Sequence, residues 1–397
     1  MRIARILTRL NLGGPARQVI ASDPVLLQRE HEVVVFAGKP EPGEGDLFEV
    51  LTERGVDVRR VPGLARGVNP AKDVVALRFL RRELKALAPD IVHTHASKAG
   101  LVGRRAARVL SGKAGLVHTF HGHVLEGYFP AFVSKRLIAT ERSLARQTDR
   151  VVAVSHATAD DLVRLEVVPE EKLSVVSPGV DLTKLLALPV RRKGAVLEPQ
   201  SGGPRNVCGI APEAVLVGVV GRLAEVKQPE VALAAFVDLA ARHRTAELVF
   251  VGDGEGRRDL ERRIESLPED VQARVHMAGH LEDPAAIFGD LDLLLMSSRT
   301  EGLPVALIEA HAAGVPAVAP DVGGVAEILA HDRTGYVVRE GEELGFHLDT
   351  LLGNADMRFV FGQRARMRVS TRYSAEALAG RLESVYQAVL EERACGS

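Results

Sequence analysis

The sequence predicts an α/β protein that consists of two doubly wound domains with parallel sheets. Short apolar runs alternate with longer segments of helical periodicity, which is the pattern of repeated β-α units. The pattern extends through the first half of the chain, breaks off, and starts again near Val215. The length of 397 residues also corresponds to two domains, since a domain has about 100–200 residues.

The predicted strands follow one another in a regular order. In the first half, the apolar runs cover residues 3–8, 32–37, 56–61, 91–94, 116–119, 150–154 and 173–177. In the second half they cover residues 215–220, 247–251, 274–278, 291–296, 316–319 and 335–338. After the last of them, residues 374–393 predict an amphipathic helix whose apolar face consists of Leu378, Leu382, Val385, Val389 and Leu390.

These patterns divide the chain into four segments. We expect a first domain over residues 1–185, a linker over 186–212, a second domain over 213–373, and a final helix with its tail over 374–397. The linker is predicted because residues 191–212 are rich in Gly, Pro and charged residues and show no periodicity.

The composition is that of an ordinary soluble globular protein. Hydrophobic residues make up 46% and charged residues 26%, which excludes a disordered, collagen-like or coiled-coil chain. The net charge of −1 and an aromatic content of 4% without any Trp argue against nucleic acid as a partner. Cys208 and Cys395 are too few for a disulfide framework or a thiolate metal site.

The sequence also predicts a cytoplasmic protein. No run at the start is long enough for a signal peptide, and nowhere do 18 apolar residues occur together. The charge is uneven: residues 1–180 hold 27 Lys and Arg against 20 Asp and Glu, whereas the remainder holds 24 against 32. Solvated helix faces explain the basic half, and peripheral contact with an anionic membrane, at its inner face, is the alternative.

Doubly wound domains bind ligands beyond the carboxyl ends of their strands, so the residues that follow each predicted strand are the candidates. Gly13 and Gly14 follow the first strand and open the first helix. Paired glycines at this point let a backbone approach a phosphate or a sugar. A tight strand-to-helix turn is the alternative.

Five histidines also stand at the ends of predicted strands: His93, His95, His118, His121 and His123. Imidazole can donate to or accept from a sugar hydroxyl or a phosphate at neutral pH. Structural hydrogen bonding and a zinc site are the alternatives. No Asp or Glu lies within the two segments, which argues against the metal.

In the second half, Arg222 and Lys227 flank the loop that follows the strand at residues 215–220. A guanidinium group binds phosphate oxygens in pairs, and an ammonium group adds a point charge. Two such cations are what a departing diphosphate requires when no metal serves it. Two solvated charges are the alternative.

Residues 299–309 contain the most informative pattern. Glu301 precedes a helix predicted to begin near Pro304, so the backbone N–H groups between Gly302 and Val305 should point at an anion. Glu309 follows eight residues after Glu301, roughly 12 Å further along. That span suits a carboxylate at each end of a sugar nucleotide. Helix capping by Glu301 and a solvent-facing Glu309 are the alternative.

Two further motifs favour structural interpretations. Residues 252–256 (GDGEG) lack the last glycine of a dinucleotide fingerprint, where Arg257 stands, which favours a packing turn. Asp290 and Asp292 match a D-x-D metal motif but lead directly into an apolar strand, which favours a turn before a buried strand.

In the first helix, Asp23-Pro24 should kink or break the helix.

Together these motifs resemble the retaining glycosyltransferases of family 4, which have the GT-B fold of two Rossmann-like domains facing each other across a cleft. The resemblance covers nearly the whole chain and implies a C-terminal helix that crosses back to the first domain. It rests on Gly13-Gly14, residues 118–123, residues 177–181 (SPGVD), Gly221-Arg222 with Lys227, Glu301 with Glu309, and Gly323-Gly324 with Glu327.

The resemblance implies a nucleotide-sugar donor, expected to be a UDP-sugar, and an unidentified hydroxyl acceptor, with no cofactor and no metal. It implies transfer of a hexose with retention of configuration, by front-face attack that needs no enzymic nucleophile. Polysaccharide, glycolipid or glycoside biosynthesis would be the setting.

The resemblance also implies a role for each candidate residue. His121 and Glu301 would be catalytic, His121 by reaching a sugar hydroxyl. Arg222 and Lys227 would hold the diphosphate and Glu309 the ribose hydroxyls. The remaining donor-binding residues would be Gly13, Gly14, Gly302, Leu303, Pro304 and Val305.

Three other functions compete with this one. A nucleotide-sugar epimerase has the same fold and would release a free altered sugar. A non-catalytic donor-binding scaffold would not need Arg222, Lys227, Glu301 and Glu309 together. A nicotinamide dehydrogenase would need a glycine fingerprint and a ribose-binding acid, which this sequence lacks.

Overall fold

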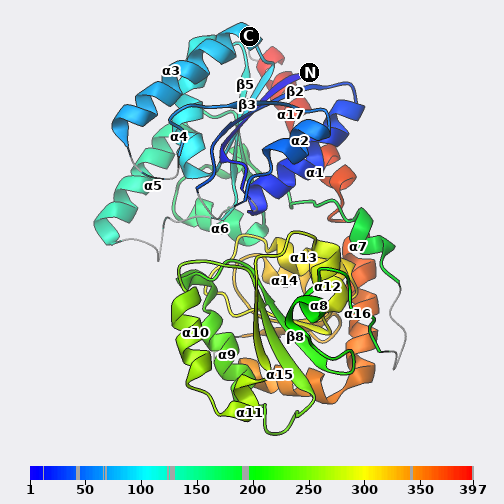
Figure 1. Cartoon of the computed structure of the whole chain (residues 1–397). Helices are drawn as coiled ribbons and strands as arrows, with labels where there is room; N and C mark the ends of the chain where they lie inside the picture. Colours follow the sequence, from blue (N-terminus) through cyan, green and yellow to red (C-terminus); the bar gives the residue numbers. More distant parts are fainter. Residues whose placement is uncertain are drawn as a thin grey trace. The chain divides into compact units, whose positions relative to one another are not determined.

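The computed structural model describes the chain except for Leu12, residues 42–44, Arg66, Val68, and residues 123–124, 126–129, 190–195, 340–342 and 396–397. The chain forms two compact units (Figure 1). Unit 1 contains Met1–Asp181 and Tyr373–Ser397, and unit 2 contains Leu182–Arg372.

Unit 1 is built on a sheet of seven parallel strands in the order β3-β2-β1-β4-β5-β6-β7. The chain winds from β1 first to one side and then to the other, which defines a doubly wound sheet. The strands are β1 (Arg2–Arg9), β2 (Glu32–Gly38), β3 (Asp57–Arg60), β4 (Ile91–His95), β5 (Gly115–Phe120), β6 (Arg150–Ala153) and β7 (Leu173–Val175).

Helices cover both faces of this sheet because successive side chains of a strand point to opposite faces. Ile3 and Leu7 of β1 pack with α1 and α17, whereas Ala4 and Ile6 pack with α3 and α4. The helices of unit 1 are α1 (Gly14–Gln28), α2 (Phe48–Glu53), α3 (Pro70–Leu87), α4 (Ala96–Ala107), α5 (Ala131–Ala145), α6 (His156–Arg164) and α17 (Ala375–Cys395), with the 3-10 turns η1 (Arg108–Leu110) and η2 (Glu170–Lys172).

The C-terminal helix α17 belongs to unit 1, as the resemblance implies. The expected residues Leu378, Leu382 and Val389 are buried, and Val385 and Leu390 pack at the edge of the same core. Tyr386 is also fully buried and was not expected there. The helix therefore completes the core that the first unit would otherwise leave open.

The expected break at Asp23-Pro24 does not occur, because α1 continues through Pro24 to Gln28. A proline in a helix leaves the carbonyl four residues earlier without its N–H partner. Here that carbonyl belongs to Ile20 and accepts from the Arg54 guanidinium at 3.4 Å. Asp23 is fully buried and is held by Arg5, whose Nη1 lies 2.7 Å from Oδ1.

Unit 2 repeats the same winding with six parallel strands in the order β10-β9-β8-β11-β12-β13. All thirteen predicted strands therefore form, with ends within two residues of the expected ones. The strands of unit 2 are β8 (Val215–Val220), β9 (Ala246–Val251), β10 (Val275–Gly279), β11 (Leu293–Leu295), β12 (Ala317–Pro320) and β13 (Gly335–Val338).

One hydrophobic core of unit 2 lies between its sheet and helices α9, α10, α15 and α16, with Phe236, Phe250 and Phe361 among its largest side chains. The helices of unit 2 are α7 (Thr183–Ala187), α8 (Pro204–Cys208), α9 (Pro229–Val237), α10 (Arg257–Glu265), α11 (Glu269–Gln272), α12 (Pro284–Asp290), α13 (Val305–Ala312), α14 (Val325–Ile328), α15 (Leu344–Gly353) and α16 (Ala355–Ser370), with the 3-10 turn η3 (Glu225–Lys227).

The segment expected as a linker over residues 186–212 is part of unit 2 where it is described, since residues 190–195 lie outside the described residues. Arg205 of α8 is 1% exposed. Its guanidinium donates to the carbonyl of Asp290 at 2.9 Å and to the carboxylate of Asp292 at 2.7 Å. A buried cation with these partners fixes residues 200–212 to the unit, so they are not a spacer.

The same contacts explain the D-x-D pattern. Asp290 accepts from the backbone N–H groups of Gln200 and Arg205, and Asp292 from that of Leu216. Both carboxylates therefore hold the chain before the buried strand β11, as the sequence favours.

Candidate functional site

In unit 1, the first candidate residues lie where β1 leads into α1. Gly13 is the residue that caps α1, and Gly14 is its first residue, with Pro15 in the first turn. Gly13 N–H and Gly14 N–H thus belong to the first orphan donors of a 15-residue helix. One turn further on, Gln18 is 7% exposed, and its side-chain nitrogen lies 3.3 Å from His121 Nδ1. The structure therefore brings the start of α1 together with His121.

His121 follows β5 and makes its second contact with His95, at the end of β4. The distance from His95 Nδ1 to His121 Nε2 is 2.9 Å. His95 in turn lies 3.2 Å from Nε and 3.1 Å from Nη2 of Arg5. His123, the last histidine of the pattern, lies outside the described residues.

The two other histidines make structural hydrogen bonds within the unit. His93 pairs with the Tyr386 hydroxyl at 2.6 Å and with the Thr119 hydroxyl at 2.7 Å. His118 pairs with the Thr94 hydroxyl at 2.8 Å. Both rings are fully buried, so they help to hold the ends of β4 and β5 in register.

All four described histidines of this cluster are neutral at physiological pH. Burial, followed by the charge of Arg5, lowers the pKa of His121 to about 3. Burial is also the main cause that holds the pKa values of His93, His95 and His118 well below the ordinary one, and the charges of Arg5 near His93 and of Arg104 near His118 add to it. Among the residues that the structure describes, no group of three or more His, Cys, Asp or Glu is arranged to hold a metal ion.

In unit 2, the structure brings Lys227 and Glu301 into direct contact. Lys227 ends η3, and its Nζ lies 2.5 Å from Glu301 Oε1. The Ser298 hydroxyl donates to the same carboxylate oxygen at 2.6 Å. The Ser297 hydroxyl donates to the carbonyls of Lys227 and Gln228, at 2.9 and 2.8 Å. The loops after β8 and β11 are thus tied together at this point.

Arg222 stands apart from this pair. It is half-exposed, and its nearest carboxylate is that of Glu255, at 3.5 Å. Its loop is held by residues 252–256: Leu223 N–H donates to the Asp253 carbonyl at 3.0 Å, and Gly256 N–H donates to the Leu223 carbonyl at 2.8 Å. A Cβ on Gly252 would lie 2.0 Å from the Gly221 carbonyl oxygen. The glycine cluster therefore packs against the Arg222 loop.

A second glycine pair supports Glu301. Gly324 N–H donates to the Gly302 carbonyl at 2.9 Å. Gly323 has a φ of +53°, and a Cβ there would lie 1.7 Å from the Glu301 carbonyl oxygen. Only glycine allows this approach of two backbones. Gly323-Gly324 therefore lets its loop pack directly against the backbone of Glu301 and Gly302.

Helix α13 begins at Val305, with Pro304 as the capping residue, one position later than expected. Leu303 is buried beneath this turn. Glu309 lies on α13 and is 5% exposed, so the expected alternative of a solvent-facing carboxylate is wrong. A buried carboxylate at this point is costly unless it has partners.

Sequence reasoning missed four residues of these sites: Gln18 beside His121, Ser298 beside Glu301, and the buried pair of Arg5 and Asp23. Arg5 gives a usable signal, because it is the one charged residue inside the apolar run 3–8. A charge in such a run is expected to be paired, and its partner marks a polar network.

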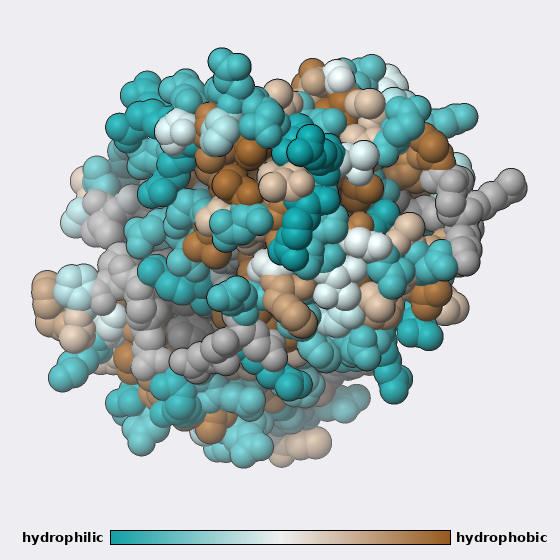
Figure 2. Space-filling model, turned by 90° about the horizontal axis from the view of Figure 1, so that it is seen from below, coloured by the Kyte–Doolittle hydropathy of each residue, from teal (hydrophilic) through white to brown (hydrophobic). Residues whose placement is uncertain are grey.

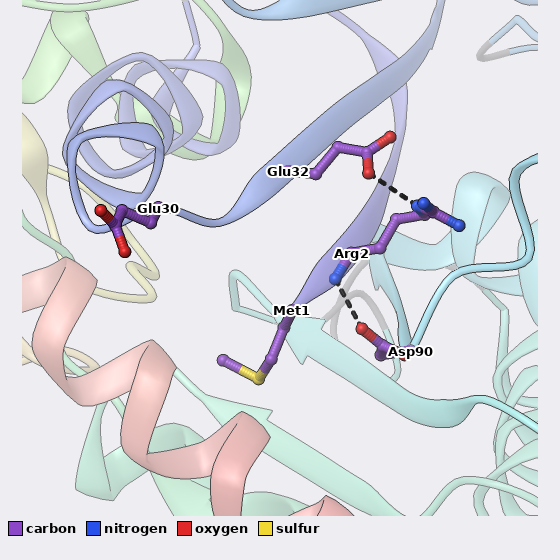
Figure 3. A pocket seen from close by; sticks show the side chains of 5 residues that line it. All are labelled: Met1, Arg2, Glu30, Glu32 and Asp90. Carbon is purple, nitrogen blue, oxygen red and sulfur yellow. Dashed lines mark hydrogen bonds and ion pairs between the residues drawn. The ribbon is translucent and has the colours of Figure 1, made fainter.

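A cavity of about 340 Å³ lies at the other edge of the unit 1 sheet, where the strands begin. It is lined by Met1, Arg2, Glu30, Glu32 and Asp90 (Figure 3). Arg2 is engaged there, with its Nε 2.7 Å from Glu32 and its backbone N–H donating to Asp90 at 2.7 Å. Ligands of doubly wound sheets bind at the opposite edge, so this cavity is not a donor site.

The surface has no broad apolar region in the view of Figure 2, where hydrophobic side chains are scattered among hydrophilic ones. Among the described helices, none is both long and apolar enough to cross a membrane.

Comparison with known proteins identifies both units. Residues 12–184 match the model of Glycosyltransferase Family 4, and residues 205–368 match that of Glycosyl transferases group 1. The UDP-Gal:alpha-D-GlcNAc-diphosphoundecaprenol alpha-1,3-galactosyltransferase of Escherichia coli is 30% identical over 280 residues, which cover 70% of each chain. The D-inositol 3-phosphate glycosyltransferase of Nocardia farcinica is 31% identical over 334 residues, 79% of this chain and 70% of that protein.

Solved structures show the same fold. HepE of Anabaena, in complex with UDP and glucose, superimposes with a TM-score of 0.80 at 18% identity, over 98% of this chain and 100% of that one. Sucrose-phosphate synthase of Thermosynechococcus elongatus has a TM-score of 0.79 at 19% identity, over 99% and 100%. The two doubly wound units and these likenesses define a glycosyltransferase with the GT-B fold. The chain belongs to glycosyltransferase family 4.

Proposed function

We propose that the protein is a retaining hexosyltransferase that moves a sugar from a UDP-sugar to an acceptor hydroxyl. The observation that carries the proposal is the contact of Lys227 with Glu301, joined by Ser298. It places a cation suited to a phosphate oxygen beside a carboxylate suited to a sugar. The Escherichia coli relative is named for a UDP-Gal donor, and HepE binds UDP, which supports uridine as the nucleoside of the donor.

In this proposal the donor diphosphate takes over Lys227 from Glu301. The Lys227 side chain is 34% exposed and that of Glu301 is 10% exposed, so water reaches the ammonium group and screens the ion pair in part. A diphosphate carries more negative charge than one carboxylate and therefore competes well for the ammonium group. Glu301 is then released toward the hexose, where its charge stabilises the positive charge that develops on the ring.

Transfer then follows without an enzymic nucleophile. The acceptor oxygen forms a bond to the anomeric carbon on the face from which the diphosphate leaves. The bond between the anomeric carbon and the phosphate oxygen breaks, and the acceptor proton passes to the leaving diphosphate. Arg222 and Lys227 compensate the charge that grows on the diphosphate, which is why we propose that the reaction needs no metal.

The acceptor side belongs to the proposal as well. The curated relatives are named for a diphosphoundecaprenol-linked sugar and for inositol phosphate as acceptors. We propose a cytoplasmic enzyme that contacts the inner face of the membrane through α5, where Phe132 is 75% exposed beside the exposed Lys135 and Arg136. Vesicles with anionic lipid should retain the protein, and Phe132→Ser should weaken retention. Equal binding to neutral vesicles would contradict the contact.

The donor experiment is a calorimetric titration with a panel of nucleotide diphosphate sugars, followed by transfer assays with and without EDTA. A UDP-sugar should bind, and the anomeric configuration of the product, read by NMR, should match that of the donor. Activity should survive EDTA. Loss of activity that Mn²⁺ or Mg²⁺ restores would show that the metal-independent mechanism is wrong, and release of a free altered sugar without acceptor would indicate an epimerase.

A further inference from the structure

We propose that Arg5 and His95 are positioning residues that hold His121 in one neutral tautomer, with its hydrogen on Nδ1. The effect on sugar transfer rests on the proposed function, whereas the tautomer does not. The inference follows from a row of four side chains in unit 1, Asp23, Arg5, His95 and His121, each within hydrogen-bond distance of the next.

The row has a direction because one of its members can only donate. A guanidinium group has no acceptor atom and stays protonated. Arg5 points both Nε–H and one Nη2–H at Nε2 of His95. That nitrogen must therefore carry a lone pair and no hydrogen. His95 is then neutral with its single hydrogen on Nδ1.

The tautomer of His95 determines that of His121. His95 Nδ1–H donates across 2.9 Å to His121 Nε2, which must be the acceptor. The remaining hydrogen of His121 is thus on Nδ1. A protonated His121 would place two N–H groups against each other across this contact. The low pKa of His121 agrees with a ring that stays neutral.

The far end of the row explains why Arg5 stays in place. Arg5 and Asp23 are 1% and 0% exposed, and Nη1 of Arg5 lies 2.7 Å from Asp23 Oδ1. Ser22 donates its hydroxyl to the same oxygen at 2.8 Å. A buried guanidinium with one buried counter-ion has no freedom to turn away from His95. In the described part of the chain, the other ionisable side chains close to these rings are His93, His118 and Tyr386.

The last contact identifies what His121 can bind. The Gln18 side-chain nitrogen lies 3.3 Å from His121 Nδ1. A half-turn of the amide group exchanges its nitrogen and oxygen, so the hydrogen-bond partners decide which of the two atoms faces the ring. Because Nδ1 carries a hydrogen, the amide must present its oxygen, or an oxygen of a ligand must take that place. His121 is therefore a donor to an oxygen and has no lone pair left to act as a general base.

The first test needs no variant. In the full-length protein labelled with ¹⁵N-histidine, long-range ¹H–¹⁵N correlation spectra report which ring nitrogen carries the hydrogen. We expect the Nδ1–H form of His121, without titration between about pH 5 and 8. An Nε2–H form, or a histidine at position 121 that titrates in this range, would overturn the proposal.

Two substitutions of His95 separate its hydrogen bonds from its volume. His95→Gln keeps an oxygen to accept from Arg5 and an N–H to donate to His121, so the Nδ1–H form should persist. His95→Leu has neither, and His121 should become a mixture of tautomers that titrates nearer to about 6.5. His243→Leu removes a histidine paired with Asp349 in unit 2 and should leave the His121 signals unchanged. If His95→Leu does not fold, the wild-type and His95→Gln spectra still decide.

The functional arm uses two separate readouts. His95→Leu should lower kcat/KM for the UDP-sugar by roughly tenfold, the loss of about one oriented hydrogen bond, and His95→Gln should restore most of it. UDP affinity, measured by calorimetry, should not change in either variant. If the wild-type protein does not bind UDP, the proposed function is wrong. If it binds UDP but His121 is not in the Nδ1–H form, only this inference is wrong.

Discussion

The two units share one winding order but differ in the chemistry at the carboxyl ends of their strands. Unit 1 places neutral rings and a buried ion pair there, with Arg5 and Asp23 almost fully out of water. Unit 2 places cations there that water reaches, with Lys227 about one third exposed and Arg222 about half exposed. Buried groups of this kind fix geometry, whereas exposed charges are free to exchange partners. This difference agrees with our proposal, in which unit 1 orients groups and unit 2 binds the charged donor.

The first prediction is that acid destabilises unit 1 far more than unit 2. In unit 1, His93, His95, His118 and His121 have lowered pKa values, whereas in the described part of unit 2 only His311 has one, of about 3. A histidine that folds neutral takes up its proton on unfolding, so its contribution is present above about pH 6.5 and is lost as the pH falls from there toward the folded pKa.

The expected size follows from about 1.4 kcal/mol per pH unit for each such group. Between pH 6 and 5, the free energy of unfolding should fall by roughly 4–5 kcal/mol in unit 1 and by about 1 kcal/mol in unit 2. Burial raises the pKa of Asp23, which acts in the opposite sense but involves a single group. Hydrogen exchange followed by mass spectrometry measures the protection of backbone amides in each unit separately. An equal loss of amide protection in both units between pH 6 and 5 would contradict the prediction.

The second prediction sharpens the role of the ion pair of Lys227 with Glu301 in unit 2. Glu301→Gln should lower kcat by roughly a hundredfold, because it removes a charge that acts on the transition state. Affinity for UDP should stay the same or rise, because the substitution frees Lys227 for the diphosphate. Steady-state rates and calorimetry test the two halves. Glu265→Gln, on the exposed side of α10, makes the same charge change and should alter neither.

The third prediction concerns the two cations. Arg222→Ala and Lys227→Ala should each weaken binding of the nucleotide sugar by about 1.5–3 kcal/mol, the value of a charge-assisted hydrogen bond. Neither should lower the free energy of unfolding by more than about 1 kcal/mol, because both side chains are partly exposed. Arg263→Ala on α10 is the matched control. Unchanged affinity in both variants would show that the diphosphate binds elsewhere.

The sequence predicted the strands well and the buried polar groups poorly, for physical reasons. Strands of parallel sheets are apolar on both faces, so runs such as 215–220 stand out without any knowledge of their neighbours. The ion pair of Arg5 with Asp23 joins two elements and is invisible to periodicity. Asp23-Pro24 predicts the end of a helix, yet α1 continues through it. Arg54 donates to the Ile20 carbonyl there, and local patterns do not show this contact because Arg54 belongs to a distant segment.

The candidate site shows the same limit. Gly323 and Glu301 were both predicted, but the contact between their backbones depends on two loops meeting. Residues 200–212 carry the composition of a linker, and only the partners of Arg205 make them part of unit 2. Local patterns thus locate the loops of the site, whereas tertiary contacts decide which of their side chains are paired.

The smallest effect is expected at Glu309, and it separates the two carboxylates of unit 2. Glu309 lies on α13, eight residues after Glu301, and is almost fully buried. We expect it to bind the ribose, which is remote from the bond that breaks. Glu309→Gln keeps one acceptor oxygen, so it should weaken UDP by only about tenfold, or ~1.4 kcal/mol, and should leave kcat nearly unchanged. Glu269→Gln, at the exposed start of α11, is the control for charge. The reverse result, with kcat falling in Glu309→Gln and UDP affinity falling in Glu301→Gln, would mean that the donor lies in the opposite direction along α13.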